Sequence, residues 1–143
     1  MTAMAKKQNL PAFPACEFSV SYSEPTRKTH KFQIDSHCHD CCEIYVNLTG
    51  DVSFMVEDTL YPVSHGDAIV TKPWERHHCV YRSDRQHKHY WLLFSAENEA
   101  LYPHFFGREP GRQNLISLPP DQKEELIALC QSLLENKEDD LGR

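Results

Sequence analysis

Hydrophobic and polar residues alternate in short runs through the first two thirds of the chain. Runs with the two-residue period of β-strands cover residues 18–22, 32–34, 44–48, 52–56, 68–71 and 90–94. Gly-, Asp- and Pro-containing turns separate them, for example at 49–51 and 64–67. Many short strands joined by tight turns predict an antiparallel sandwich or barrel, and they disfavour alternating β and α units.

After residue 94 the pattern changes to a helical period. Pro119 and Pro120 precede an acidic first turn, and apolar residues then recur with the spacing of one helical face. This spacing predicts an amphipathic helix of roughly four turns. Its apolar stripe must cover either the barrel or a second copy of the chain. The stripe consists of Leu126, Leu129, Cys130, Leu133 and Leu134.

These patterns divide the chain into three parts. We expect a flexible N-terminal arm over residues 1–14 and a β-barrel over residues 15–95. Residues 96–143 are expected to form an irregular segment and the amphipathic helix.

Composition limits the classes of function. The chain has 143 residues, of which 40% are hydrophobic, and this is enough for one domain with a core. The net charge of −6 disfavours binding of nucleic acid by this chain, because such binding depends on Lys and Arg neutralising phosphates. No apolar run approaches the roughly 20 residues of a membrane span, and residues 1–14 do not resemble a signal peptide. We therefore expect a cytoplasmic protein without membrane contact.

Candidate metal ligands lie around the start of the third run. His37, His39 and Glu43 share one parity, so an unbroken strand would project all three to the same side. Two imidazoles and a carboxylate suit a divalent transition metal. A fourth ligand would come from a distant strand, and His77 and His78 are the candidates. Two reserve ligands share the parity of the first set: Asp35 and Cys41.

Three further residues are candidates for binding a small molecule. Tyr45 and Asn47 continue the parity of Glu43, and Arg82 shares the parity of His78. An aromatic surface beside convergent polar groups suits a sugar or another small polar metabolite.

Two sequence motifs resemble those of the cupin family. The pattern His37-x-His39-x3-Glu43-x6-Gly50 is similar to the first cupin motif, and Gly66-Asp67-x5-Pro73-x4-His78 is similar to the second. The resemblance implies a small β-barrel in which a divalent transition metal (Zn, Ni, Fe or Mn) is held inside. The implied ligands are His37, His39, Glu43 and His78. The second motif departs from the family pattern at Glu75, where glycine is usual, and at Arg82, where asparagine is frequent.

The order of the segments resembles one branch of that family. Together, 37–50, 67–73, 89–95 and 102–106 are similar to the N-terminal effector-binding domain of AraC/XylS-type transcription regulators, over about residues 17–135. This implies a mainly β fold, a cupin (double-stranded β-helix or jelly-roll) barrel followed by a C-terminal α-helix.

The same resemblance implies a function. The domain would bind a small-molecule effector and form a homodimer, without being an enzyme. DNA would be bound only through a C-terminal domain that this chain does not contain. The alternative is a stand-alone metal-dependent cupin enzyme, a dioxygenase or isomerase.

Overall fold

The computed structural model of the protein describes residues 18–24, 40–49, 51–83, 86–95 and 103–141. The predicted arm over 1–14 and the predicted strand over 32–34 lie outside these ranges. Eight strands and two helices are present in the described part of the chain. They are β1 (Phe18–Ser23), β2 (Cys42–Asn47), β3 (Val52–Val56), β4 (Thr59–Val63), β5 (Ala68–Thr71), β6 (His77–Tyr81), β7 (His89–Phe94), α2 (Pro103–Phe106), β8 (Leu115–Ile116) and α3 (Pro120–Leu141).

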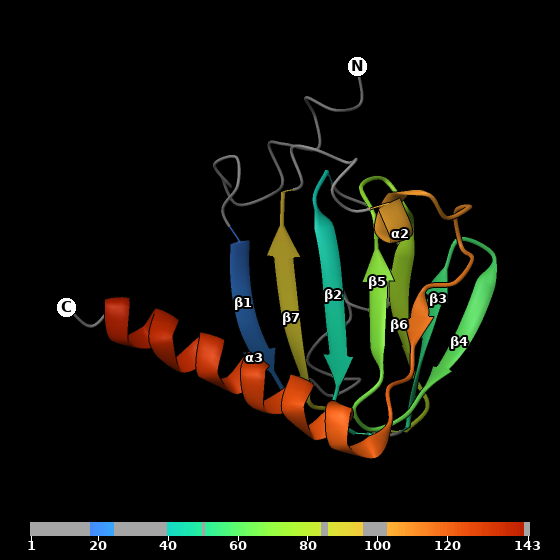
Figure 1. The fold of residues 1–143 in the computed structure, drawn as a ribbon. Coiled ribbons are helices and arrows are strands. Elements are labelled where there is room, and N and C mark those ends of the chain that lie inside the picture. Colours follow the sequence, from blue (N-terminus) through green and yellow to red (C-terminus); the bar gives the residue numbers. More distant parts are fainter. Residues whose placement is uncertain (1–17, 25–39, 50, 84–85, 96–102, 142–143) are drawn as a thin grey trace.

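The strands form two antiparallel sheets. One has five strands in the order β1-β7-β2-β5-β8, and the other has three in the order β4-β3-β6. Figure 1 shows α3 running obliquely across the five-stranded sheet, near the lower ends of its strands. The predicted fold class, a mainly β barrel followed by a C-terminal helix, is confirmed.

Several elements differ from the predicted ones. The pattern did not predict β4, β6 or β8, and α3 has 22 residues instead of roughly four turns. β4 contains Pro62, which cannot donate to a ladder, but among the described strands β4 lies at the edge of its sheet, where proline is tolerated. β6 begins with two histidines, so its sequence does not alternate between apolar and polar residues, although its side chains alternate between buried and half-buried.

Two hydrophobic clusters stabilise the fold, one on each side of the five-stranded sheet. The interior cluster lies between the two sheets and consists of Tyr45, Val52, Phe54, Val56, Val63, Ile69, Cys79 and Tyr81. The outer cluster lies between the five-stranded sheet and α3 and consists of Val46, Ala68, Tyr90 and Cys130, with Ile44, Leu48, Leu92, Leu126, Ile127 and Leu134 packed against it. Two central strands of this sheet, β2 and β5, thus contribute alternate residues to the two clusters.

The turn between β4 and β5 anchors the start of α3. The Asp67 carboxylate accepts hydrogen bonds from the Ser64 amide (2.9 Å) and the Ser117 hydroxyl (2.8 Å), and it pairs with Lys123 Nζ at 3.0 Å. Gly66 has a φ of 78°, and a Cβ there would lie only 2.7 Å from the Lys123 Cβ. Both the conformation and the close approach therefore require glycine.

No helix within the described ranges has both the length and the hydropathy to cross a membrane.

Candidate functional site

Glu43, in the second position of β2, is a carboxylate inside the barrel. Its side chain is 3% exposed, and both of its oxygens have partners. Oε2 lies 3.2 Å from His77 Nε2, and Oε1 accepts a hydrogen bond from Trp91 Nε1. Strand register explains the second contact, because Trp91 lies opposite Tyr45, two residues along β2 from Glu43.

His77 begins β6 on the opposite sheet and points into the same interior. Its side chain is 1% exposed and its ring stacks on Phe54, with ring centroids 5.8 Å apart. Nδ1 lies 2.8 Å from the backbone carbonyl of Glu75. A carbonyl can only accept a hydrogen bond, so Nδ1 carries the proton and Nε2 is directed at Glu43.

The electrostatics of this pair favour a charged imidazole. Burial by itself lowers the pKa of His77, but the Glu43 carboxylate and the Glu75 carbonyl outweigh burial, so that the pKa lies above its ordinary value. The geometry therefore places a buried imidazole and a buried carboxyl group within hydrogen-bonding distance, in an arrangement that favours protonation of the imidazole. The same orientation, with Nδ1 held by a carbonyl, is also the one that directs Nε2 of a histidine toward a metal ion.

The structure brings His77, not the predicted ligand His78, next to Glu43. In the β3–β6 ladder His77 lies opposite the buried Val56, whereas His78 lies opposite the half-buried Met55. Successive side chains of a strand point to opposite faces, so His78 lies on the outer face of the three-stranded sheet. The register of β6 against β3 therefore directs the His77 side chain, and not that of His78, into the interior.

The other predicted metal ligands, His37 and His39, lie outside the described residues. Within the ranges that are described, no three His, Cys, Asp or Glu side chains form a group that could hold a metal ion. Glu43 and His77 supply two suitable donor atoms 3.2 Å apart, which fits two ligands of one metal ion.

Tyr45 lies in the same interior as Glu43. Its ring stacks on His89, with centroids 4.4 Å apart, and packs against Phe54 at 5.0 Å. Burial raises the pKa of its hydroxyl well above the ordinary value, so the group stays protonated and able to donate a hydrogen bond.

Asn47 and Arg82, the other two predicted ligand-binding residues, occupy different surroundings. Asn47 is fully buried at the far end of β2, where its Nδ2 donates to the carbonyls of Thr49 and of Ser64 (3.3 Å). Arg82 is exposed, and its Nη2 donates to Ser53 Oγ at 2.6 Å. Asn47 thus connects two turns, and Arg82 covers the outer side of the three-stranded sheet.

Sequence reasoning missed several interior residues that the strand register brings together. Thr71 lies directly opposite Glu43, and His89 lies opposite Asn47. The alternation of side chains along each strand is visible in the sequence. It identifies the interior residues only once the pairing of the strands is known.

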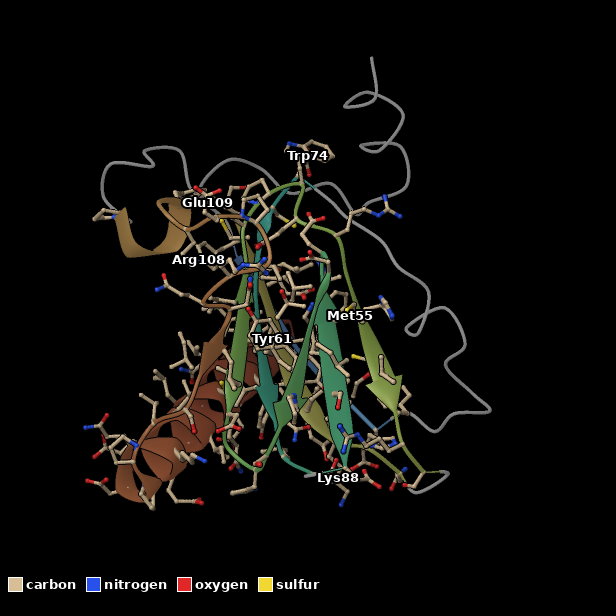
Figure 2. All side chains as sticks on the ribbon, turned by 90° about the vertical axis from the view of Figure 1, so that its right-hand side faces the viewer. Met55, Tyr61, Trp74, Lys88, Arg108 and Glu109 are labelled. Carbon is tan, nitrogen blue, oxygen red and sulfur yellow. The ribbon has the colours of Figure 1, made fainter. Side chains whose placement is uncertain are left out.

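A buried charge network lies at the same end of the barrel as the pair of Glu43 and His77. Glu75 is buried, and its carboxylate lies 3.4 Å from the guanidinium of Arg108, which is 8% exposed. Figure 2 shows Arg108 at the barrel end marked by Trp74, with Lys88 at the opposite end. Burial opposes ionisation of Glu75, but the Gly111 amide, Asn114 and the other donors outweigh burial and lower its pKa.

Comparison with known proteins agrees with this fold. Residues 17–141 match a family model described as the AraC-like ligand binding domain. No curated protein sequence matches the chain significantly.

Two solved structures illustrate the likeness. The crystal structure of AerE from Microcystis aeruginosa is similar over 71% of this chain, with 17% identity and a TM-score of 0.51. A Cupin 2 conserved barrel domain protein from Salinispora arenicola matches 64% of this chain and 71% of its own, with 24% identity and a TM-score of 0.41. This chain spans only 42% of AerE. At 17% identity the likeness to AerE establishes the fold alone.

Proposed function

Because the chain belongs to the family of AraC-like ligand-binding domains, we propose that it is the small-molecule sensing domain of a transcription regulator. One observation carries the proposal: the carboxyl group of Glu43 and the imidazole of His77 meet inside the barrel, beside aromatic rings and the Tyr45 hydroxyl. Burying ionisable groups costs free energy of folding, so the presence of two such groups in the interior favours a role in binding. The whole regulator would bind DNA through a C-terminal domain, and we propose that it acts in the cytoplasm.

The interior chemistry favours a small polar effector, of which a sugar is one class. Glu43 can accept hydrogen bonds from hydroxyl groups, while the protonated Nε2 of a charged His77 and the Tyr45 hydroxyl would donate to oxygen atoms. The ring of Trp91, which is only half-buried, would offer apolar surface to the carbon side of such a ligand.

A thermal-shift screen of sugars and small polar metabolites tests this proposal. A ligand that binds only the folded state stabilises it by about 2.7 kcal/mol when present at 100 times its Kd. The matched variants are His77→Ala and His78→Ala, which remove the same side chain from opposite faces of β6. We expect His77→Ala to abolish the shift and His78→Ala to retain it.

Two results would oppose the proposal. If no compound stabilises the wild-type chain, the sensing function loses its support. If a stabilising compound is converted to a product during incubation, that result supports the alternative of a metal-dependent cupin enzyme.

We also propose that the interior holds a divalent transition metal (Zn, Ni, Fe or Mn). The residues that would hold it are Glu43, the predicted His37 and His39, and His77 in place of His78. The orientation of His77 supports this set, because its Nδ1 is engaged by a carbonyl and its Nε2 adjoins Glu43. When bound, such a metal supplies Lewis-acid positions for oxygen atoms of an effector.

Elemental analysis of protein purified without chelators tests the metal and identifies it. We expect about one metal ion per chain in the wild type and in His78→Ala, and a large loss in His77→Ala. Wild-type protein without metal would refute the site. Loss of metal in His78→Ala alone would restore the ligand set that the sequence motif implies.

We propose that the domain forms a homodimer through the outward side of α3. The predicted apolar stripe divides in the structure, since Leu126 packs on the outer cluster while Leu129 is 57% exposed. An exposed leucine on an otherwise polar surface favours contact with a second apolar surface. Leu129→Asp should lower the mass seen by sedimentation. Gln131→Asp, which adds the same charge to an exposed position on the opposite flank of the same helix, should not.

A further inference from the structure

Glu75 joins two segments that are far apart in the sequence. Its carboxylate accepts hydrogen bonds from the Lys72 amide (3.0 Å) in the turn after β5, and from the Gly111 amide (2.8 Å) and Asn114 Nδ2 (3.0 Å). The last two belong to residues 106–114, the segment that connects α2 to β8. One buried carboxylate therefore attaches this segment to the barrel end.

Two cations complete the attachment. The Arg108 guanidinium lies 3.4 Å from both carboxylate oxygens of Glu75 and donates to the Arg112 carbonyl at 3.0 Å. Lys72 Nζ donates to the carbonyls of Phe106 (3.3 Å) and Arg108. Charge-assisted hydrogen bonds of this kind are roughly twice as strong as neutral ones, so the segment is firmly held.

Backbone strain is concentrated in the segments that meet at Glu75. Among the described residues, three non-glycine residues have positive φ: Glu57 (51°), Trp74 (70°) and Gln113 (56°). Trp74 precedes Glu75, Gln113 precedes Asn114, and the Glu57 amide donates to the Arg76 carbonyl at 2.8 Å. Such conformations persist only where the surrounding contacts hold them, and they often mark functional regions.

The same residue also contacts the interior site. The backbone carbonyl of Glu75 accepts the hydrogen bond from His77 Nδ1 at 2.8 Å, and His77 Nε2 faces Glu43. On the other side, segment 106–114 continues into β8, which pairs with β5, and then into α3. The Val70 amide donates to the Asn114 carbonyl at 2.9 Å.

We propose that Glu75 is a positioning residue that couples the orientation of His77 in the barrel interior to the attachment of residues 106–114. Its side chain fixes the turn whose carbonyl orients the imidazole, and it fixes the segment that leads to α3. An effector that moves His77 then alters the anchoring of that segment. The regulatory meaning of this coupling rests on the proposed sensing function, whereas the coupling itself is measurable without an effector.

NMR of the full chain tests the coupling. In Glu75→Gln we expect the ring-nitrogen signals of His77 to shift, and exchange of the Val70 amide to accelerate about tenfold, as expected when a charge-assisted hydrogen bond is lost. The matched control is Asp67→Asn, which removes a buried, cation-paired carboxylate at the β4–β5 turn. That variant should lower stability but leave the His77 signals unchanged.

The reverse experiment uses the interior side chain. Because coupling is reciprocal, His77→Ala should accelerate exchange of the Gly111 amide, and His78→Ala should not. Should Glu75→Gln fail to fold, Tyr61→Phe gives the same test more gently, since the Tyr61 hydroxyl donates to the Gly111 carbonyl at 2.7 Å. We then expect a smaller shift of the His77 signals.

Unchanged His77 signals in a folded Glu75→Gln or Tyr61→Phe protein would overturn the proposal. So would equal shifts in Asp67→Asn, because they would show a general response to lost stability. A failed effector screen with these NMR changes present would reject the sensing function and leave the coupling intact.

Discussion

The two faces of the five-stranded sheet differ in what their side chains do. Along β2, Glu43 and Tyr45 point into the barrel, whereas Ile44 and Val46 point to the outside and pack under α3. On this strand the inner side chains are polar or aromatic and make hydrogen bonds and ring contacts across the interior. The outer ones are apolar. A single strand with a two-residue period thus places the residues of the candidate site on one face and the apolar packing residues on the other.

The two faces also contribute differently to the free energy of unfolding. Apolar side chains on the outer face stabilise the fold by roughly 25 cal/mol for each Å² removed from water. The pair of Glu43 and His77 gains little, because the desolvation of two charges offsets their attraction. Replacing the charged pair of the inner face by apolar residues is therefore expected to lower the free energy of unfolding less than introducing a charge on the outer face.

The largest effect is expected for Val46→Asp on the outer face. Val46 is fully buried between the sheet and α3, so the new carboxylate would be buried without a partner. A cost of about 3–5 kcal/mol would remove much of the stability of a small domain. Circular dichroism and urea unfolding measure it. Leu60→Asp, at a position that is 47% exposed, is the control and should change stability by about 0.5 kcal/mol or less. A folded Val46→Asp protein of wild-type stability would contradict the assignment of this face.

The second prediction concerns the inner face and its pair of charges. Glu43→Leu alone leaves His77 buried without its carboxylate and should cost about 3 kcal/mol in urea unfolding at neutral pH. The double variant Glu43→Leu with His77→Leu removes both charges and should return to within about 1 kcal/mol of the wild type. It should nevertheless lose the metal and the effector. If the double variant were less stable than either single one, the pair would be a stabilising feature and the contrast between the faces would fail.

Much of the fold could be predicted because strand alternation is a local property. The runs over 44–48, 52–56, 68–71 and 90–94 correspond to β2, β3, β5 and β7 within a residue or two. β4 was missed because Pro62 is tolerated only at an edge, and an edge is known only from the sheet order.

The candidate site was less predictable, because it depends on contacts between distant segments. Whether His77 or His78 faces inward is set by the turn before β6, where Trp74 has a φ of 70°. The partner of Glu75 is Arg108, 33 residues away in the chain. No local pattern contains that pairing. In the same way, the spacing of the second motif favoured His78 as the fourth ligand, whereas the structure places His77 beside Glu43.

The third prediction concerns pH and the anchoring of α3. Burial opposes ionisation of Asp67, but Ser64, Lys123 and Ser117 outweigh burial and lower its pKa below the ordinary value of 3.8. This contribution to stability is therefore present above that value and is lost as the pH falls through the lower pKa of the folded protein. Asp67→Asn should reduce the free energy of unfolding at about pH 6, and the difference from the wild type should shrink toward about pH 3. Urea unfolding across this range measures it, and a difference that grows toward acid would have the wrong sign.

The smallest effect on stability is expected for Arg82→Ala, which tests directly whether ligands bind inside or outside the barrel. Arg82 is exposed and bonds Ser53 on the outside of the three-stranded sheet, so its loss should change stability by about 0.5 kcal/mol or less. Because the side chain lies outside the barrel, the shift produced by any stabilising compound should remain that of the wild type. Tyr45→Phe is the matched inner change, since it removes one buried hydroxyl and keeps the ring. The opposite result would be a compound whose thermal shift is lost in Arg82→Ala and retained in Tyr45→Phe. That result would place the binding surface on the outside of the barrel, and the assignment of ligand binding to the interior would be wrong.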